Sequence, residues 1–145
     1  MTGVQTCALP IWAGQILNSY FKKIEPAGGN NLSAKLFVND VVPTDTDTAA
    51  SYTEATGGGY ESKTLAVADC TVSNVDGIMQ AAYPQQSFVF TGPLTTNSTV
   101  YGVYVVDADG VLICAERFAV PYEPVNAGDT IGVTPKFRLS KGTAT

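Results

Sequence analysis

The sequence predicts a mainly β protein, an antiparallel β sandwich of about seven strands with one short N-terminal amphipathic helix. Three observations lead to this prediction. The chain is 45% hydrophobic and only 14% charged, a balance typical of globular domains rather than disordered chains. Short runs of β-branched and aromatic residues alternate with turns of Gly, Asp and Pro. The length of 145 residues suits one domain with one substantial core.

The first eleven residues, MTGVQTCALPI, resemble the in-frame translation of an oligonucleotide adapter used in short-read sequencing. We therefore expect residues 1–11 to be an artefactual segment that packs poorly and keeps Val4, Leu9 and Ile11 out of the core. A disordered or edge-strand terminus is the lower-ranked alternative. The resemblance implies an assembled environmental sequence in which Trp12 is a truncation point and residues 12–141 form the single domain.

Charge and hydropathy argue against several classes of partner. The apolar stretch that begins at Cys7 imitates a signal peptide, but no basic residue precedes Lys22, and a secretory signal begins with basic residues. No apolar run approaches the roughly 18 residues that cross a bilayer. Eight Lys and Arg stand against thirteen Asp and Glu, and the densest basic cluster is Lys136, Arg138 and Lys141. We therefore expect neither membrane nor nucleic-acid binding.

The helix is predicted at residues 13–24 from the spacing of their apolar side chains. Lysines in its last turn suit the helix dipole, and Pro26 ends it. Five apolar residues form one stripe of a 3.6-residue period: Ile16, Leu17, Tyr20, Phe21 and Ile24.

The first half of the β region predicts two strands separated by a long loop. Residues 33–39 have Leu, Phe and Val at their centre, and residues 60–67 alternate in the manner of a half-buried strand. Residues 40–59 combine Pro, Thr, Asp and the triple glycine Gly57 to Gly59, which predicts a loop with at most a short irregular strand. We expect the glycines to give the backbone freedom where the chain enters the next strand.

Two further strands are predicted in the middle of the chain. Residues 69–74 form a weaker strand that ends at the turn pair Asp76-Gly77. Residues 87–91 form a short strand that ends at Gly92-Pro93.

The clearest local pattern is a hairpin. The runs 99–106 and 111–118 are rich in β-branched and aromatic residues and flank the turn 107–110, Asp-Ala-Asp-Gly. Apolar residues occupy both phases of both runs, so we expect both strands to be central ones covered on both faces.

The last strand spans residues 130–139, with apolar residues in one phase and polar residues in the other. Pro135 falls in the apolar phase, and proline removes a ladder donor, so we expect an edge position or a bulge there. Residues 142–145 are expected to be a disordered tail.

No composed active site is visible. The chain has no histidine, which excludes Ser-His-Asp and Cys-His arrangements and any His metal site. A pair of carboxylates remains as a catalytic alternative, although nothing in the sequence pairs the candidates. These candidates are Glu25, Glu54, Glu61, Glu116 and Glu123.

Other acidic and amide motifs are better explained by turns. Asp107, Asp109 and Gly110 resemble a fragment of a calcium loop, but the remaining ligands are missing. A turn is likewise the favoured explanation for the pair Asp45 and Asp47. Two stretches match glycosylation acceptors, and turn chemistry is again the better explanation. They are Asn31-Leu32-Ser33 and Asn97-Ser98-Thr99. We therefore expect no metal, cofactor or catalytic residues.

Once residues 1–11 are set aside, the cysteines are Cys70 and Cys114. We expect buried thiols, with a disulfide between the two as the alternative.

Six tyrosines could form a sugar-binding or protein-binding surface, but most lie within strand patterns, so packing between strands is the favoured role. They are Tyr52, Tyr60, Tyr83, Tyr101, Tyr104 and Tyr122.

A series of turn glycines and strand aromatics spans most of the chain. In order, the residues are Leu17-Asn18, Leu36-Phe37 with Pro43-Thr44, Glu54 with Gly57 to Tyr60, Phe88-Val89-Phe90, Tyr101-Gly102-Val103-Tyr104 with Asp107 and Gly110, Ala115-Glu116-Arg117-Phe118, and Gly128-Asp129-Thr130. In this series the chain after Trp12 resembles small structural proteins of tailed bacteriophages, of the tail-fibre, head-fibre or decoration kind.

The resemblance implies a non-enzymatic virion structural module that packs on capsid or tail subunits or displays a host-contact surface. It implies other virion proteins as partners, a homo-oligomer, and a place in the virion after assembly in the bacterial host cytoplasm. The alternative is a secreted or surface carbohydrate-binding or adhesin module, which would need two or three exposed tyrosines on one sheet face.

Overall fold

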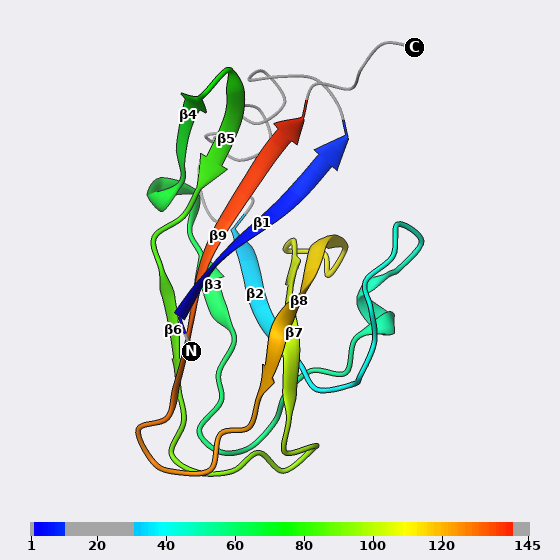
Figure 1. Ribbon diagram of the computed structural model, residues 1–145, viewed down its shortest axis with the longest axis vertical. Coiled ribbons are helices and arrows are strands. Elements are labelled where there is room, and N and C mark those ends of the chain that lie inside the picture. The colour runs from blue at the N-terminus through cyan, green and yellow to red at the C-terminus, as the bar shows by residue number, and fades with distance from the viewer. Residues whose placement is uncertain (1, 11–30, 141–145) are drawn as a thin grey trace.

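The computed structural model describes residues 2–10 and 31–140, and its described side chains run from residue 31 to residue 138. This part of the chain is mainly β, as predicted, but it holds nine strands rather than about seven (Figure 1). The strands are β1 (Thr2–Pro10), β2 (Leu32–Phe37), β3 (Lys63–Leu65), β4 (Thr71–Val75), β5 (Ile78–Ala82), β6 (Gln86–Val89), β7 (Val100–Val106), β8 (Leu112–Tyr122) and β9 (Thr130–Ser140). Two 3-10 helices, η1 (Ala49–Ser51) and η2 (Val67–Asp69), lie between strands.

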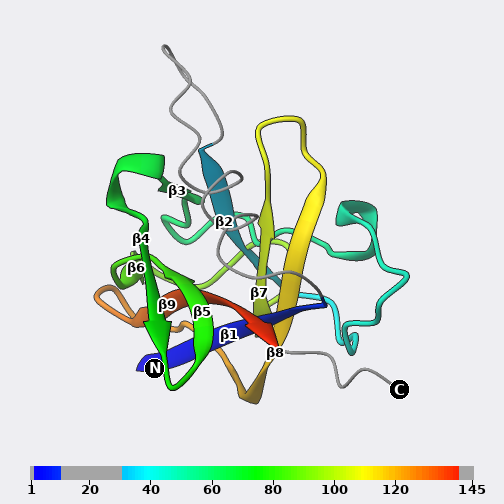
Figure 2. The ribbon, with the colours of Figure 1, turned by 90° about the horizontal axis from the view of Figure 1, so that it is seen from above.

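The nine strands form two sheets. The five-stranded sheet has the order β1-β9-β5-β4, and β6 also pairs with β9. The four-stranded sheet has the order β3-β2-β7-β8. The pairs are antiparallel in both sheets, except that β1 runs parallel to β9. Figure 2, which looks down from above, shows β1, β9 and β5 in one layer and β2, β7 and β8 in the other.

Both sheets contribute to one hydrophobic core. Alternate residues of β2, among them Leu36, point into it, as does Val105 of β7. From the five-stranded sheet come Phe88, Ile131 and Phe137, which are almost fully buried. Because side chains alternate between the faces of a strand, this common core requires the two sheets to pack face to face.

The turn predicted at Asp76-Gly77 is confirmed, and it closes a two-residue hairpin between β4 and β5. Both residues have positive φ, 52° and 81°, which is the backbone of a type I′ turn. The strand after it, β5, was missed by the sequence analysis. Its sequence, IMQAA, has little β-branched character, and its position between β4 and β9 comes from tertiary pairing.

The last strand was expected to lie at an edge or to be bulged at Pro135. The edge position is wrong, whereas the bulge alternative agrees with a register that shifts by one residue between the pairs Gln86–Val133 and Ala82–Lys136. β9 is central, because β1 pairs on one side and β5 and β6 pair on the other. Pro135 is accommodated by a break in its partner: β6 pairs with β9 up to Val133, and β5 pairs from Lys136 onward. The carbonyl of Pro135 still accepts a hydrogen bond from Tyr83 N, 3.0 Å away. The N–H that proline lacks therefore falls at the break between β6 and β5, where neither strand's ladder includes a hydrogen bond from residue 135.

The predicted hairpin is confirmed, but only one of its strands is central. β7 lies between β2 and β8, and nearly all of its residues are buried. β8 ends the four-stranded sheet, and its residues 112–117 are only half-buried. Apolar residues occupy both phases of β8 because some pack on the main core and others, such as Leu112 and Ala115, pack on the outer side of the sheet.

The predicted strand 33–39 is confirmed as β2, and the predicted strand 60–67 shortens to the three residues of β3. Between them lies the predicted long loop, which we call the 38–59 loop. It contains η1 and one isolated antiparallel bridge between Phe37 and Glu54. At the end of this loop Gly57 to Gly59 all have positive φ, 80°, 56° and 74°, which confirms the role expected of the triple glycine.

The backbone of Thr2–Pro10 pairs with β9 along its whole length. This matches the edge-strand alternative and not the expectation of a stretch that packs poorly. Its side chains, including Val4 and Leu9, are outside the described ones, and the origin of residues 1–11 stays a prediction. Ile11, the predicted helix at 13–24 and the predicted tail at 142–145 also lie outside the described residues.

Candidate functional site

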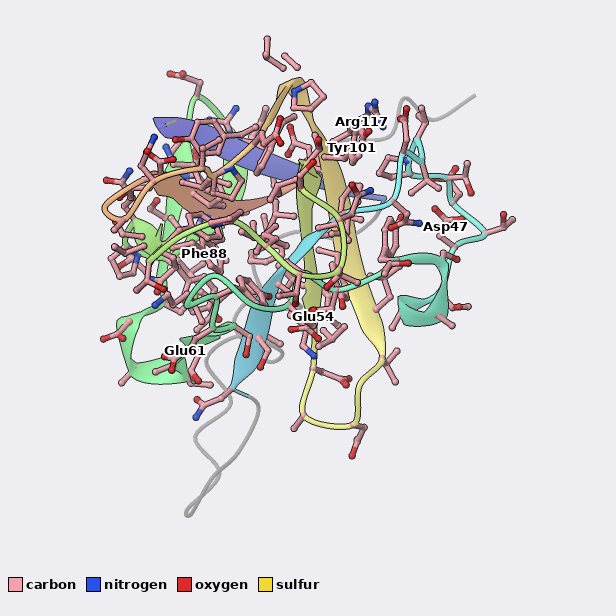
Figure 3. The ribbon with its side chains drawn as sticks, turned by 90° about the horizontal axis from the view of Figure 1, so that it is seen from below. Asp47, Glu54, Glu61, Phe88, Tyr101 and Arg117 are labelled. Carbon is pink, nitrogen blue, oxygen red and sulfur yellow. The ribbon has the colours of Figure 1, made fainter. Side chains whose placement is uncertain are left out.

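The most elaborate polar arrangement of the described chain holds the 38–59 loop against the outer side of the four-stranded sheet (Figure 3). Beneath the loop lies a second hydrophobic cluster, separate from the main core, which we call the outer aromatic cluster. Its buried members are Phe37, Tyr52, Tyr104 and Val106. The Tyr52 ring lies 5.0 Å from Phe37 and 5.2 Å from Tyr104, measured between centroids. Three polar contacts fasten the loop over this cluster.

The first contact is made by Asp47. Its carboxylate accepts hydrogen bonds from the Tyr52 hydroxyl at 2.7 Å and from the Thr44 amide and hydroxyl, each at 2.9 Å. These donors favour the charged carboxylate, so the Tyr52 hydroxyl, followed by the Thr44 amide, lowers the pKa of Asp47. Burial and the same contact raise the pKa of Tyr52. Asp47 therefore closes the loop on itself and ties it to the outer aromatic cluster.

Asp47 should make stability sensitive to acid. A carboxyl whose folded-state pKa is lowered below its model value of 3.8 stabilises the fold above that pH and loses this contribution as pH falls through the folded-state value. We expect the free energy of unfolding, measured by urea titration, to fall less steeply from pH 5 to pH 2.5 in Asp47→Asn than in the wild type. Asp45→Asn, at an exposed position two residues away, should follow the wild-type slope. Equal slopes for Asp47→Asn and the wild type would contradict this role.

The second contact centres on Glu54. One carboxylate oxygen lies 2.9 Å from Lys35 Nζ, and the other accepts a hydrogen bond from the Tyr60 hydroxyl at 3.1 Å. The Tyr60 oxygen in turn accepts the Leu36 amide of β2 at 3.1 Å. Burial is the main cause that raises the pKa of Tyr60. Burial, with the charge of Glu54 added, also raises the pKa of Tyr104 to about 12.

These tyrosines should resist ionisation while the chain is folded. A tyrosine whose pKa is raised above its model value of 10.0 contributes stability that is fully present below pH 10 and is lost as pH rises through its folded-state pKa. We expect the tyrosinate absorbance at 295 nm to show fewer than the seven tyrosines of the chain ionising near pH 10 before unfolding. Tyr104→Phe should reduce the loss of stability above pH 10. If all seven tyrosines ionised in a single step near pH 10 while the protein stayed folded, this expectation would be contradicted.

The third contact is made by Arg117 of β8. Its guanidinium Nη1 lies 2.6 Å from Asp40 Oδ1 and donates to the Val41 carbonyl at 3.0 Å. The guanidinium carbon also lies 4.9 Å from the centre of the Tyr101 ring, a cation–π geometry. One cation thus ties the beginning of the loop to two strands.

The predicted carboxylate candidates lie on different parts of the described chain. Glu54 is bound to Lys35 and Tyr60, and Glu61 is exposed and lies apart from it in Figure 3. Glu116 is half-buried on β8, and Glu123 is exposed after it. Glu25 lies outside the described residues.

The other acidic motifs serve turns, as the sequence analysis favoured. Asp107 accepts the amides of Asp109 and Val111 at 3.0 and 2.9 Å, which closes the β7–β8 turn. Asp129 accepts the amides of Val125 and Asn126 at 2.8 and 2.9 Å, and these bonds lower its pKa. No group of three or more metal-ligating side chains occurs within residues 31–138.

The asparagines of the two glycosylation motifs are also used internally. Asn31 Oδ1 accepts the Val67 amide at 3.1 Å, and Asn97 Nδ2 donates to the Val38 carbonyl at 2.8 Å. Of the two cysteines, Cys70 is a buried thiol whereas Cys114 is disulfide-bonded. The alternative of a Cys70–Cys114 pair is therefore wrong, and so is the expectation of a thiol at Cys114.

None of the six tyrosines singled out in the sequence is exposed. Tyr52, Tyr83 and Tyr104 are buried, and the others are half-buried. Tyr60 stacks on Phe88 with its ring centre 6.0 Å away. The packing role favoured from the sequence is therefore confirmed for these positions. Sequence reasoning missed the fastening contacts of Lys35 and Arg117, since no local pattern links them to the 38–59 loop.

No protein-family model matches the chain, and no curated protein or solved structure matches it at a significant level. Within the described residues, no helix is long and apolar enough to cross a membrane.

Proposed function

We propose that the chain is a non-enzymatic structural module of a tailed-phage virion, which packs on capsid or tail subunits or displays a surface for host contact. The observation that carries the proposal is how the polar side chains are used. Asp47, Glu54 and Arg117, which are the kinds of residue that build catalytic or ligand sites, hold the 38–59 loop against the sheet. A β module whose long loop is held against its sheet suits a part of an assembly.

We also infer that the architecture is an antiparallel β sandwich in which β1 is the parallel exception. The common core between the two sheets supports this description. A sandwich suits packing against neighbouring subunits, because pre-organised interfaces usually change little when a partner binds.

The carbohydrate-binding or adhesin alternative receives less support. It depends on two or three tyrosines exposed on one sheet face, and the tyrosines of the described sheets are buried or half-buried. Those that are half-buried are engaged by other side chains, as Tyr101 is by Arg117.

Two measurements test the proposed function. The genes that flank this coding sequence should encode portal, capsid or tail proteins, and the purified chain should form oligomers in light scattering after size exclusion. Metabolic genes on both sides, together with a monomer at all concentrations, would contradict the proposal. Saturable binding to a glycan array would favour the carbohydrate-binding alternative instead.

A further inference from the structure

The five-stranded sheet has an outward face that lies away from β2 and β7 (Figure 2). The core residues of β9 are odd-numbered, among them Ile131 and Phe137, so its even-numbered side chains point outward, because side chains alternate along a strand. Val72 of β4, Ala81 of β5 and Phe88 of β6 pack inward in the same way, which fixes the outward positions of those strands. We call the outward side of β4, β5, β6 and β9 the outer β9 face.

The charge of the outer β9 face is opposite to that of the chain, whose net charge is −5. β4, β5, β6 and β9 contain no aspartate or glutamate, and their charged residues are two cations of β9, Lys136 and Arg138. Both lie at outward positions. Within residues 31–138, the cations that form ion pairs are Lys35 and Arg117, which belong to the four-stranded sheet. Lys136 and Arg138 therefore have no carboxylate partner among the described side chains.

Gln80 holds the guanidinium of Arg138 in place. The two residues are direct partners in the β5–β9 pair, and Arg138 Nε donates a hydrogen bond to Gln80 Oε1 at 2.8 Å. Gln80 is only 7% exposed, and burying an amide is costly unless it is hydrogen-bonded. Because Nε is used for Gln80, the two terminal nitrogens of Arg138 are left as a planar fork, the geometry that binds a carboxylate with two hydrogen bonds.

The spacing of the two cations matches an extended acidic segment. Lys136 and Arg138 are neighbours on one face of a strand, about 7 Å apart along it. In an extended segment, two glutamates separated by one residue are also about 7 Å apart and lie on one face, so each can meet one cation. A nucleic acid is a poorer match, because two cations on a chain of net charge −5 cannot neutralise a run of phosphates.

We propose that the outer β9 face docks an acidic, extended segment of a partner protein, with one carboxylate bound by the Arg138 fork and the next by Lys136. Because the chain as a whole is acidic, such a segment is attracted to this face and repelled elsewhere, which sets the orientation of docking. The inference rests on the proposed function for the class of partner, a neighbouring subunit, and adds the face and the chemistry of the contact.

Two peptides that differ only in the order of their residues test the spacing. The probe has the sequence Thr-Thr-Glu-Thr-Glu-Thr-Thr, and the matched peptide, Thr-Thr-Glu-Glu-Thr-Thr-Thr, places its glutamates on opposite faces of an extended chain. Titration at low salt, followed by the amide chemical shifts of the protein, should show saturable binding of the probe with shifts concentrated at residues 78–82 and 130–138. The matched peptide should bind more weakly, and high salt should weaken both.

Substitutions that each remove one positive charge locate the site. Arg138→Gln should weaken binding of the probe about tenfold or more, as the loss of a charged hydrogen-bonded pair does, and Lys136→Gln about threefold, as the loss of an exposed ion pair does. The matched control is Lys63→Gln on β3, where the ammonium lies 5.9 Å from the centre of the inward-facing Phe88 ring. We expect it to change the affinity by less than about twofold.

Gln80→Met tests the positioning role of Gln80. Methionine nearly keeps the size of the side chain but removes the acceptor for Arg138 Nε. Binding of the probe should weaken when Arg138 is present and should not weaken further in the Arg138→Gln background, since both substitutions act through one guanidinium. Equal effects of Gln80→Met in both backgrounds would overturn the assignment of the fork.

Three results would overturn the docking site itself: no saturable binding of the probe, equal losses for Lys136→Gln and Lys63→Gln, or tighter binding of an oligothymidylate than of the probe. The proposed function is tested separately. If the probe fails to bind while the flanking genes encode virion proteins, the docking site is wrong and the virion role stands. Metabolic flanking genes, together with a probe that binds as expected, would contradict the virion role and keep the docking site.

Discussion

Replacing Gly102 by alanine is expected to lower the free energy of unfolding by about 3 kcal/mol or more, as overpacking against atoms that cannot move does. A Cβ at this position would lie 2.2 Å from the Glu116 carbonyl oxygen and 2.5 Å from the Phe37 ring. Neither neighbour can give way, because the carbonyl belongs to the paired strand β8 and Phe37 is completely buried. Gly102 is the position in β7 at which the Phe37 ring lies against the backbone.

Urea unfolding followed by circular dichroism measures this effect. The matched control is Gly92→Ala, because a Cβ at Gly92 meets no atom within 4 Å, and we expect it to change stability by less than about 0.5 kcal/mol. If Gly102→Ala fails to fold, Phe37→Leu in the same background should restore folding in part, since it shortens the side chain that clashes. Equal stabilities for the two alanine variants would contradict the close approach.

Gly58→Ala is expected to cost about 3 kcal/mol, from a left-handed backbone and a backbone clash together. Gly58 has φ +56°, and a Cβ there would lie 2.5 Å from the Gly92 carbonyl oxygen and 2.8 Å from the Pro93 carbonyl oxygen. The Gly58 carbonyl also accepts the Thr91 amide at 2.8 Å. The substitution should therefore separate the end of the 38–59 loop from the segment after β6.

A second glycine isolates the clash from the backbone strain. Gly77 also has positive φ, +81°, but a Cβ there would meet nothing within 4 Å. We expect Gly77→Ala to cost only about 1 kcal/mol, the strain of the left-handed backbone alone. Thermal unfolding of the two variants side by side measures the difference, and a Gly77→Ala variant as unstable as Gly58→Ala would refute the argument from packing.

Part of the candidate site was within reach of the sequence. The turn at Asp107 to Gly110, a long loop at residues 40–59 and the internal role of the tyrosines were all predicted. These features depend on short-range chemistry, such as an aspartate that accepts nearby amides. The contacts of Glu54 with Lys35 and Tyr60, and of Arg117 with Asp40, could not be predicted. They join residues far apart in sequence, and any exposed glutamate or arginine has the same local pattern.

By itself, the sequence determined the class of the fold and most of its strands, because alternation, β-branched content and glycine turns act within a few residues. Tertiary structure alone decided which strands are central. β9 became central despite Pro135 because its partner breaks opposite the proline, and β8 ended a sheet despite its apolar residues. The tertiary structure also decided that β1 pairs with β9 in a parallel direction. Sheet order depends on which long-range pairs bury the most apolar surface together, and no local window of sequence contains that information.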